Sequence, residues 1–102
     1  MKFSEVRKVL KTKLLVGEIQ HEARHGGFDK KNLLATGDVT PDDVIEMLDC
    51  AKVFNFKVAK HHNKEVDINV YIFTPSWNDE KWYIKAYIIE PDAWFISVHP
   101  SE

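Results

Sequence analysis

Residues 81–99, KWYIKAYIIEPDAWFISVH, decide the fold that the sequence predicts. The segments 82–89 and 94–99 are rich in β-branched and aromatic residues, which favour strands. Residues 90–92, Glu-Pro-Asp, have the composition of a turn, because proline fixes φ and aspartate bonds its own backbone. We therefore expect an antiparallel hairpin at this end of the chain.

The alternation of side chains sets the expected pairing, because a shift of one residue moves a whole strand's set to the other face. A loop with an odd number of residues, 90–92, places the apolar residues of both strands on the same face of the hairpin. These residues are Trp82, Ile84, Ala86 and Ile88, and Trp94, Ile96 and Val98. The predicted pairs are Tyr83 with His99, Lys85 with Ser97, and Tyr87 with Phe95. The second face of the hairpin is then strongly polar.

The rest of the chain predicts helices first and strands afterwards. Ser4 is a good N-cap for a first helix, and Thr40 followed by Pro41 is a strong helix start. From Val53 the apolar period changes to two, which favours strands. We expect one α+β domain over 1–102. In it, N-terminal helices (1–52) cover one face of a C-terminal four-stranded antiparallel meander (53–99).

Composition restricts the class of protein further. The chain has 102 residues, 44% hydrophobic and 29% charged, as is usual for one globular domain. A net charge of −2 gives no overall basic field, so any nucleic-acid site has to be a local patch. The single Cys50 excludes an internal disulfide and fits a reducing cytoplasm. No signal peptide and no apolar run of about 18 residues is visible, so we expect no membrane contact.

The most noticeable short motif is HEARH at 21–25, which fits the H-E-x-x-H pattern of zinc hydrolases. In that reading His21 and His25 bind zinc and Glu22 is the general base. The glycines at 26–27 end any helix directly after the second ligand. No third ligand follows at a familiar spacing, although His61 or His62 could supply one. We therefore expect a surface segment and no metal, with a small zinc hydrolase as the weakest alternative.

The polar face of the hairpin is the strongest candidate for a site. Cleavage of RNA without a metal needs a base for the 2′-hydroxyl, an acid for the leaving oxygen, and cations for the phosphorane charge. His99, Tyr83 and Lys85 could fill these catalytic roles, and aromatic rings could stack unpaired bases.

Other polar residues are expected to bind the substrate beside these three. The candidates are Lys57, Lys60, His61, Asn69, Tyr87 and Ser97. Lys57, Asn69 and Tyr71 are expected on the uncovered face of the sheet. Two alternatives stay open. In the first, the basic turn around His61 is only a solvated hairpin tip. In the second, Tyr71, Tyr87 and Phe95 pack under another element or a partner chain.

The order of these segments resembles the MqsR-type toxins, which belong with the RelE-like mRNA interferases. The resemblance rests on FSEVRKVL, GDVTPDDVIEML and WYIKAYIIEPDAWFISVH. It implies a small α+β protein that cuts single-stranded mRNA without a cofactor and is silenced by a cognate antitoxin. By position, the family's hairpin tyrosine falls on Tyr83 and its terminal catalytic lysine on His99. The family's helix lysine falls on Glu46, and its strand glutamine falls near Ile68.

These observations favour an endoribonuclease toxin of a bacterial type II toxin–antitoxin system, located in the cytoplasm. The first alternative is a non-enzymatic protein-binding or regulatory module on the same fold. Glu46 and the negative net charge favour that alternative.

Overall fold

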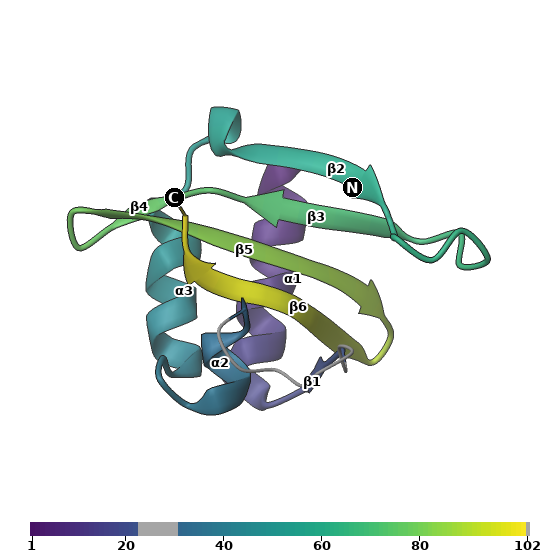
Figure 1. The fold of residues 1–102 in the computed structure, drawn as a ribbon, viewed down its shortest axis with the longest axis horizontal. Helices are drawn as coiled ribbons and strands as arrows, with labels where there is room; N and C mark the ends of the chain where they lie inside the picture. Colours follow the sequence, from purple (N-terminus) through teal and green to yellow (C-terminus); the bar gives the residue numbers. More distant parts are fainter. Residues whose placement is uncertain (23–30, 102) are drawn as a thin grey trace.

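The computed structural model describes residues 1–22 and 31–101, which form an α+β fold of two layers (Figure 1). The helices are α1 (Phe3–Val16), α2 (Leu33–Thr36) and α3 (Pro41–Cys50). The strands are β1 (Ile19–His21), β2 (Phe56–Lys60), β3 (Asn69–Phe73), β4 (Ser76–Trp77), β5 (Glu80–Ile89) and β6 (Asp92–Pro100). Within the described residues, no helix has the length and apolar character needed to cross a membrane.

The start of α3 confirms the prediction from Thr40 and Pro41. The Thr40 side chain accepts a hydrogen bond from the Asp43 amide at 3.1 Å, and the Asp43 carboxylate accepts from the Thr40 amide at 2.9 Å. The predicted cap of α1 is wrong, because Lys2 rather than Ser4 is the N-cap. Glu5 accepts the Lys2 amide at 3.0 Å, which moves the start of the helix two residues earlier.

The predicted four-stranded antiparallel meander is wrong in detail, because the sheet of the described residues has six strands and is mixed. Its order is β1-β6-β5-β3-β2, with β4 paired to β5. The additional strand β1 runs parallel to β6. Gly17, at φ 80°, ends α1, so the chain that follows can turn and pair as β1.

The hairpin of β5 and β6 follows the predicted register only in part. Two of the three predicted pairs are confirmed, Tyr83 with His99 and Lys85 with Ser97. The third is wrong, because Tyr87 lies opposite Trp94 instead of Phe95.

Two features of the hairpin cause this difference. The turn is shorter than predicted, since Ile89 already pairs with Asp92. A β-bulge between Lys85 and Ala86 then adds one residue to β6, Ile96, and restores the predicted pairs beyond it. Trp94 and Ile96 therefore pack with the cluster on the face away from the helices, which reverses their predicted face.

The strand β3 also has the opposite phase to the one predicted. Tyr71 is only 7% exposed and lies in the helix-side core, so its predicted place on the uncovered face is wrong. Its ring stacks on Phe56 with centroids 6.2 Å apart. The prediction treated Tyr71 as polar because of its hydroxyl, whereas its aromatic ring is part of the core.

The helices cover one face of the sheet, as expected, and no helix of the described residues lies on the other face (Figure 1). We call the second face the open face. The principal core between helices and sheet includes Val6, Leu10, Met47, Leu48, Phe73, Ile84, Phe95 and Val98, all completely buried. This core fixes the strands whose outward side chains form the candidate site.

Candidate functional site

A shallow pocket lies on the open face where β5 and β6 run side by side. Its lining residues are Lys31, Tyr83, Lys85, Ser97 and His99, and its volume is about 310 Å³. We call it the Tyr83–His99 pocket. Three of the four strand residues are half-buried, whereas Ser97 is 3% exposed and forms its floor. All three residues predicted to be catalytic therefore line one pocket.

Tyr83 and His99 form the aromatic wall of this pocket. Their rings stack with centroids 5.3 Å apart and an angle of 27° between the planes. His99 Nδ1 lies 2.8 Å from the carbonyl oxygen of Pro100. A carbonyl oxygen only accepts, so Nδ1 carries the proton and donates it. In the neutral ring, Nε2 then holds the lone pair that a general base requires.

Lysine side chains supply positive charge to the same surface. Lys85 lies opposite Ser97 on β6 and opposite Ile72 on β3, and Ile72 lies opposite Lys57 on β2. These four residues form one row across four strands. Neighbouring strands are about 4.8 Å apart, so Lys57 lies roughly 10 Å from Lys85 along the open face. A nucleic-acid backbone that crosses the pocket can reach both cations.

Lys31 is the pocket residue that sequence analysis missed. It precedes Asn32, which is completely buried and forms an isolated parallel bridge with Val98 of β6. The Asn32 side chain donates to the Phe95 carbonyl at 3.2 Å and caps α2 by accepting the Ala35 amide at 3.2 Å. No local sequence pattern predicts a contact between this segment and β6, because the two are more than sixty residues apart in the chain.

Tyr87 and His61 lie outside the Tyr83–His99 pocket, although both were candidates for substrate binding. The Tyr87 hydroxyl donates to Glu22 Oε1 at 3.0 Å, and His61 Nε2 lies 2.6 Å from the same oxygen. Tyr87 is 6% exposed and His61 is 8% exposed. Burial, together with the Glu22 carboxylate, raises the pKa of Tyr87 to about 12. We call this region of the open face, with Trp94 and Ile96, the sealed end.

The last two candidates, Lys60 and Asn69, also lie away from the pocket. Lys60 forms an exposed ion pair with Asp67 at 3.0 Å. Asn69 is exposed and lies opposite Lys60 at the ends of β3 and β2. By strand alternation Asn69 shares a face with Tyr71, which packs on the helix side, so its predicted place on the uncovered face is wrong.

His21, the first histidine of the H-E-x-x-H motif, lies in a strand and not in the helix that the zinc chemistry of this motif requires. His21 is the last residue of β1, and its Nδ1 lies 3.2 Å from Asn32 Nδ2. Burial lowers the pKa of His21, which favours the neutral ring. His25 lies outside the described residues. Because His21, the first proposed zinc ligand, does not lie on a helix, the structure does not support the zinc hydrolase alternative.

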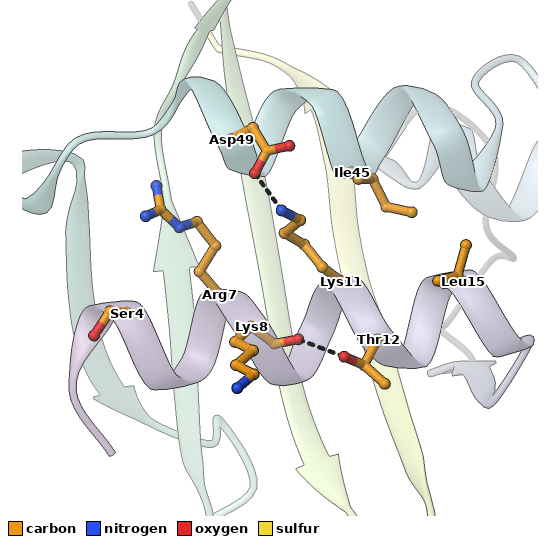
Figure 2. Close-up of a pocket in the computed structure, with 8 residues that line it drawn as sticks. All are labelled: Ser4, Arg7, Lys8, Lys11, Thr12, Leu15, Ile45 and Asp49. Atoms are coloured by element: carbon orange, nitrogen blue, oxygen red, sulfur yellow. Dashed lines mark hydrogen bonds and ion pairs between the residues drawn. The ribbon is translucent and has the colours of Figure 1, made fainter.

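A larger groove, of about 410 Å³, lies between α1 and α3 on the helical side of the molecule (Figure 2). Figure 2 shows Lys11 and Asp49 joined across it, and their Nζ and Oδ1 atoms are 2.5 Å apart. Arg7 donates to the Ala51 carbonyl at 3.2 Å. These contacts hold the two helices together, and the described residues that line the groove include no histidine or tyrosine. We therefore take the Tyr83–His99 pocket, despite its smaller volume, as the candidate functional site.

Comparison with known proteins gives no match to any protein family, curated protein or solved structure. The likeness to RelE-like interferases consequently stays a prediction from the residues quoted above.

Proposed function

We propose that this chain is a metal-independent endoribonuclease, an mRNA interferase toxin of a bacterial type II toxin–antitoxin system. The observation that carries the proposal is the Tyr83–His99 pocket. It combines a histidine of defined tautomer, a tyrosine hydroxyl and two lysines on one surface. Lysine, tyrosine, serine and histidine suit acid–base chemistry on a phosphodiester, and none of the described residues that line the pocket is a carboxylate.

Four of the five residues that line the pocket have a chemical role in this proposal. Nε2 of His99 accepts the proton of the 2′-hydroxyl, whose oxygen then attacks the neighbouring phosphorus. Lys85 and Lys31 stabilise the negative charge that builds up on the phosphorane. The Tyr83 hydroxyl lies beside His99 and donates a hydrogen bond or a proton to the leaving 5′-oxygen.

The open face suits a single-stranded substrate. The pocket is shallow, and the row from Lys57 to Ser97 crosses four strands without a helix above it. A base splayed out of the strand can stack on the Tyr83 ring, while the phosphates contact Lys57 and Lys85. The proposed location is the cytoplasm, and the proposed partner is a cognate antitoxin that blocks this face or its access.

The alternative of a non-enzymatic binding module rested on Glu46 and on the negative net charge, and the structure bears on the first of these grounds. Glu46 accepts a hydrogen bond from Trp77 Nε1 at 3.3 Å, and Trp77 packs against the helix-side core. Its charge therefore acts between α3 and β4 and not in the pocket. The reversal of charge at this position removes no cation from the proposed site, which weakens that alternative.

Cleavage of RNA by purified protein tests the proposal. We expect His99→Ala to lower the cleavage rate by roughly 10²- to 10⁴-fold, the usual contribution of a general base. His62→Ala, at an exposed histidine of the β2–β3 loop, is the matched control and should keep wild-type cleavage. Both should be assayed with and without a chelator. Equal cleavage by wild type and His99→Ala would contradict the proposal, as would loss of wild-type cleavage in the chelator.

A further inference from the structure

Glu22, His61 and His62 converge at the sealed end from distant parts of the chain. Glu22 directly follows β1, and the two histidines directly follow β2. These strands are the two outermost in the order β1-β6-β5-β3-β2. One ligand atom from each of the three side chains lies within 4.8 Å of the other two. The fold therefore gathers two imidazoles and a carboxylate across the width of the sheet.

The chemistry of this cluster is that of a site for a divalent cation. Two imidazole nitrogens and a carboxylate oxygen are a common ligand set for zinc, with bonds of about 2.0–2.2 Å. His62 Nδ1 and Glu22 Oε2 are 3.9 Å apart, which is too far for a hydrogen bond. The gap is wide enough for an ion with bonds of about 2 Å to each atom.

Burial around the cluster resembles that of a built site with one access path. The side chains of His61 and Glu22 are 6% and 16% exposed, whereas that of His62 is 62% exposed. Tyr87 donates to Glu22 Oε1 at 3.0 Å, and its ring meets the His61 ring edge-on at 5.1 Å. Such an outer partner orients a ligating carboxylate and is a usual part of a metal site.

We propose that Glu22, His61 and His62 bind one divalent cation of the zinc type. The ligand atoms are a carboxylate oxygen of Glu22, Nε2 of His61 and Nδ1 of His62. Three protein ligands leave a fourth position for water or another small ligand. The ion joins the end of β1 to the β2–β3 loop and thereby clips the two edges of the sheet together. This inference does not depend on the proposed function.

Binding requires a defined local change at His61. The ion replaces the 2.6 Å contact between His61 Nε2 and Glu22. The ring proton then moves to Nδ1, which gives up the 3.1 Å bond that it accepts from the Asn63 amide. His61 keeps one ring proton in this exchange. The loop has to adjust at Asn63, and His61 and Glu22 have to move apart, because two atoms 2.6 Å apart are too close to be ligands of one tetrahedral ion.

The test is a titration of the full chain, purified without a histidine tag and freed of metal with a chelator. Zn²⁺ binding is measured by calorimetry, and Co²⁺ serves as a probe whose visible absorption reports its coordination. We expect one ion per chain and a higher Tm in its presence, because the ion binds the folded state. Binding of no ion, or of several weak ions with no rise in Tm, would overturn the proposal.

His62→Ala is the decisive variant, because this exposed side chain can be removed without a cavity. We expect it to weaken binding by at least the roughly 10- to 100-fold that loss of an outer-shell partner causes. Glu22→Gln should weaken binding similarly. The matched control is His99→Ala, which removes a histidine from the other end of the open face. Binding that survives His62→Ala, or that disappears in His99→Ala, would refute the assignment.

Discussion

The two ends of the open face are built from the same strands but differ in how far their side chains are buried. At one end Tyr83 is half-buried and lines a pocket with His99, whereas at the other Tyr87 is 6% exposed and bonded to Glu22. Only three residues of β5 lie between the two tyrosines, and both point away from the helices. The two tyrosines differ in what covers them, because the β2–β3 loop and Glu22 lie over Tyr87 and not over Tyr83. A polar residue on a strand face is therefore not by itself a functional residue.

The bulge in β6 marks the boundary between the two ends. Ile96, the added residue, packs with Val70 and Tyr87 at the sealed end, while Ser97 forms the floor of the pocket. A bulge places two neighbouring residues of one strand against a single residue of the other. The sequence of β6 can thereby supply a hydrophobic contact to one end and a polar floor to the other.

The largest expected loss of stability comes from the sealed end. Ile96 is 2% exposed, so Ile96→Ala should lower the free energy of unfolding by about 2–5 kcal/mol. Ile89→Ala is the matched control, since Ile89 is 47% exposed near the turn of the same hairpin. It should change stability by less than about 1 kcal/mol. Urea unfolding of both variants measures the difference, and equal losses would show that the sealed end is not a packed cluster.

Asn32 should give the next largest effect, because it fixes the segment that brings Lys31 to the pocket. Asn32→Ala removes the cap of α2 and leaves the buried Phe95 carbonyl without its side-chain donor. We expect a loss of about 2–3 kcal/mol in the free energy of unfolding. Asn69→Ala, at an exposed position, should have little effect. If the two variants were equally stable, the proposed anchoring of Lys31 would be wrong.

A smaller effect should appear at alkaline pH. The pKa of Tyr87 is raised from its ordinary value near 10 to about 12, so the folded state holds the phenolic proton more tightly than the unfolded state. This contribution to stability is complete below pH 10 and is lost as the pH rises from about 10 to about 12. The difference in unfolding free energy between wild type and Tyr87→Phe should shrink across that window. A constant difference would contradict the buried contact with Glu22.

The polar end of the hairpin was predictable, and the sealed end was not. Strong β-formers and local alternation predict the hairpin, and the predicted pairs Tyr83 with His99 and Lys85 with Ser97 are correct. They are correct because the shorter turn and the bulge at Ile96 shift the register in opposite directions and cancel. The bulge at Ile96 leaves no signal in a period-two pattern, because either phase of β6 places apolar residues on both faces.

The contacts of Lys31 and Glu22 could not be predicted from the sequence, for a different reason. Each depends on a segment that meets the sheet from far away in the chain, and only the assembled fold brings them together. Tyr71 shows a third limit. Its hydroxyl suggested a polar face, whereas the packing of its ring against Phe56 decided where it lies.

The central claim is that Tyr83 serves chemistry and Tyr87 serves structure, and a matched pair of hydroxyl deletions tests it most directly. Cleavage of RNA and urea unfolding should be measured for Tyr83→Phe and Tyr87→Phe beside the wild type. We expect Tyr83→Phe to lose roughly 10²-fold or more in cleavage rate with its stability changed by less than about 0.5 kcal/mol. Tyr87→Phe should keep wild-type cleavage and lose about 1.5–3 kcal/mol, the usual value of a hydrogen bond to a charged group. Unchanged cleavage in Tyr83→Phe, or a loss of cleavage confined to Tyr87→Phe, would contradict the account.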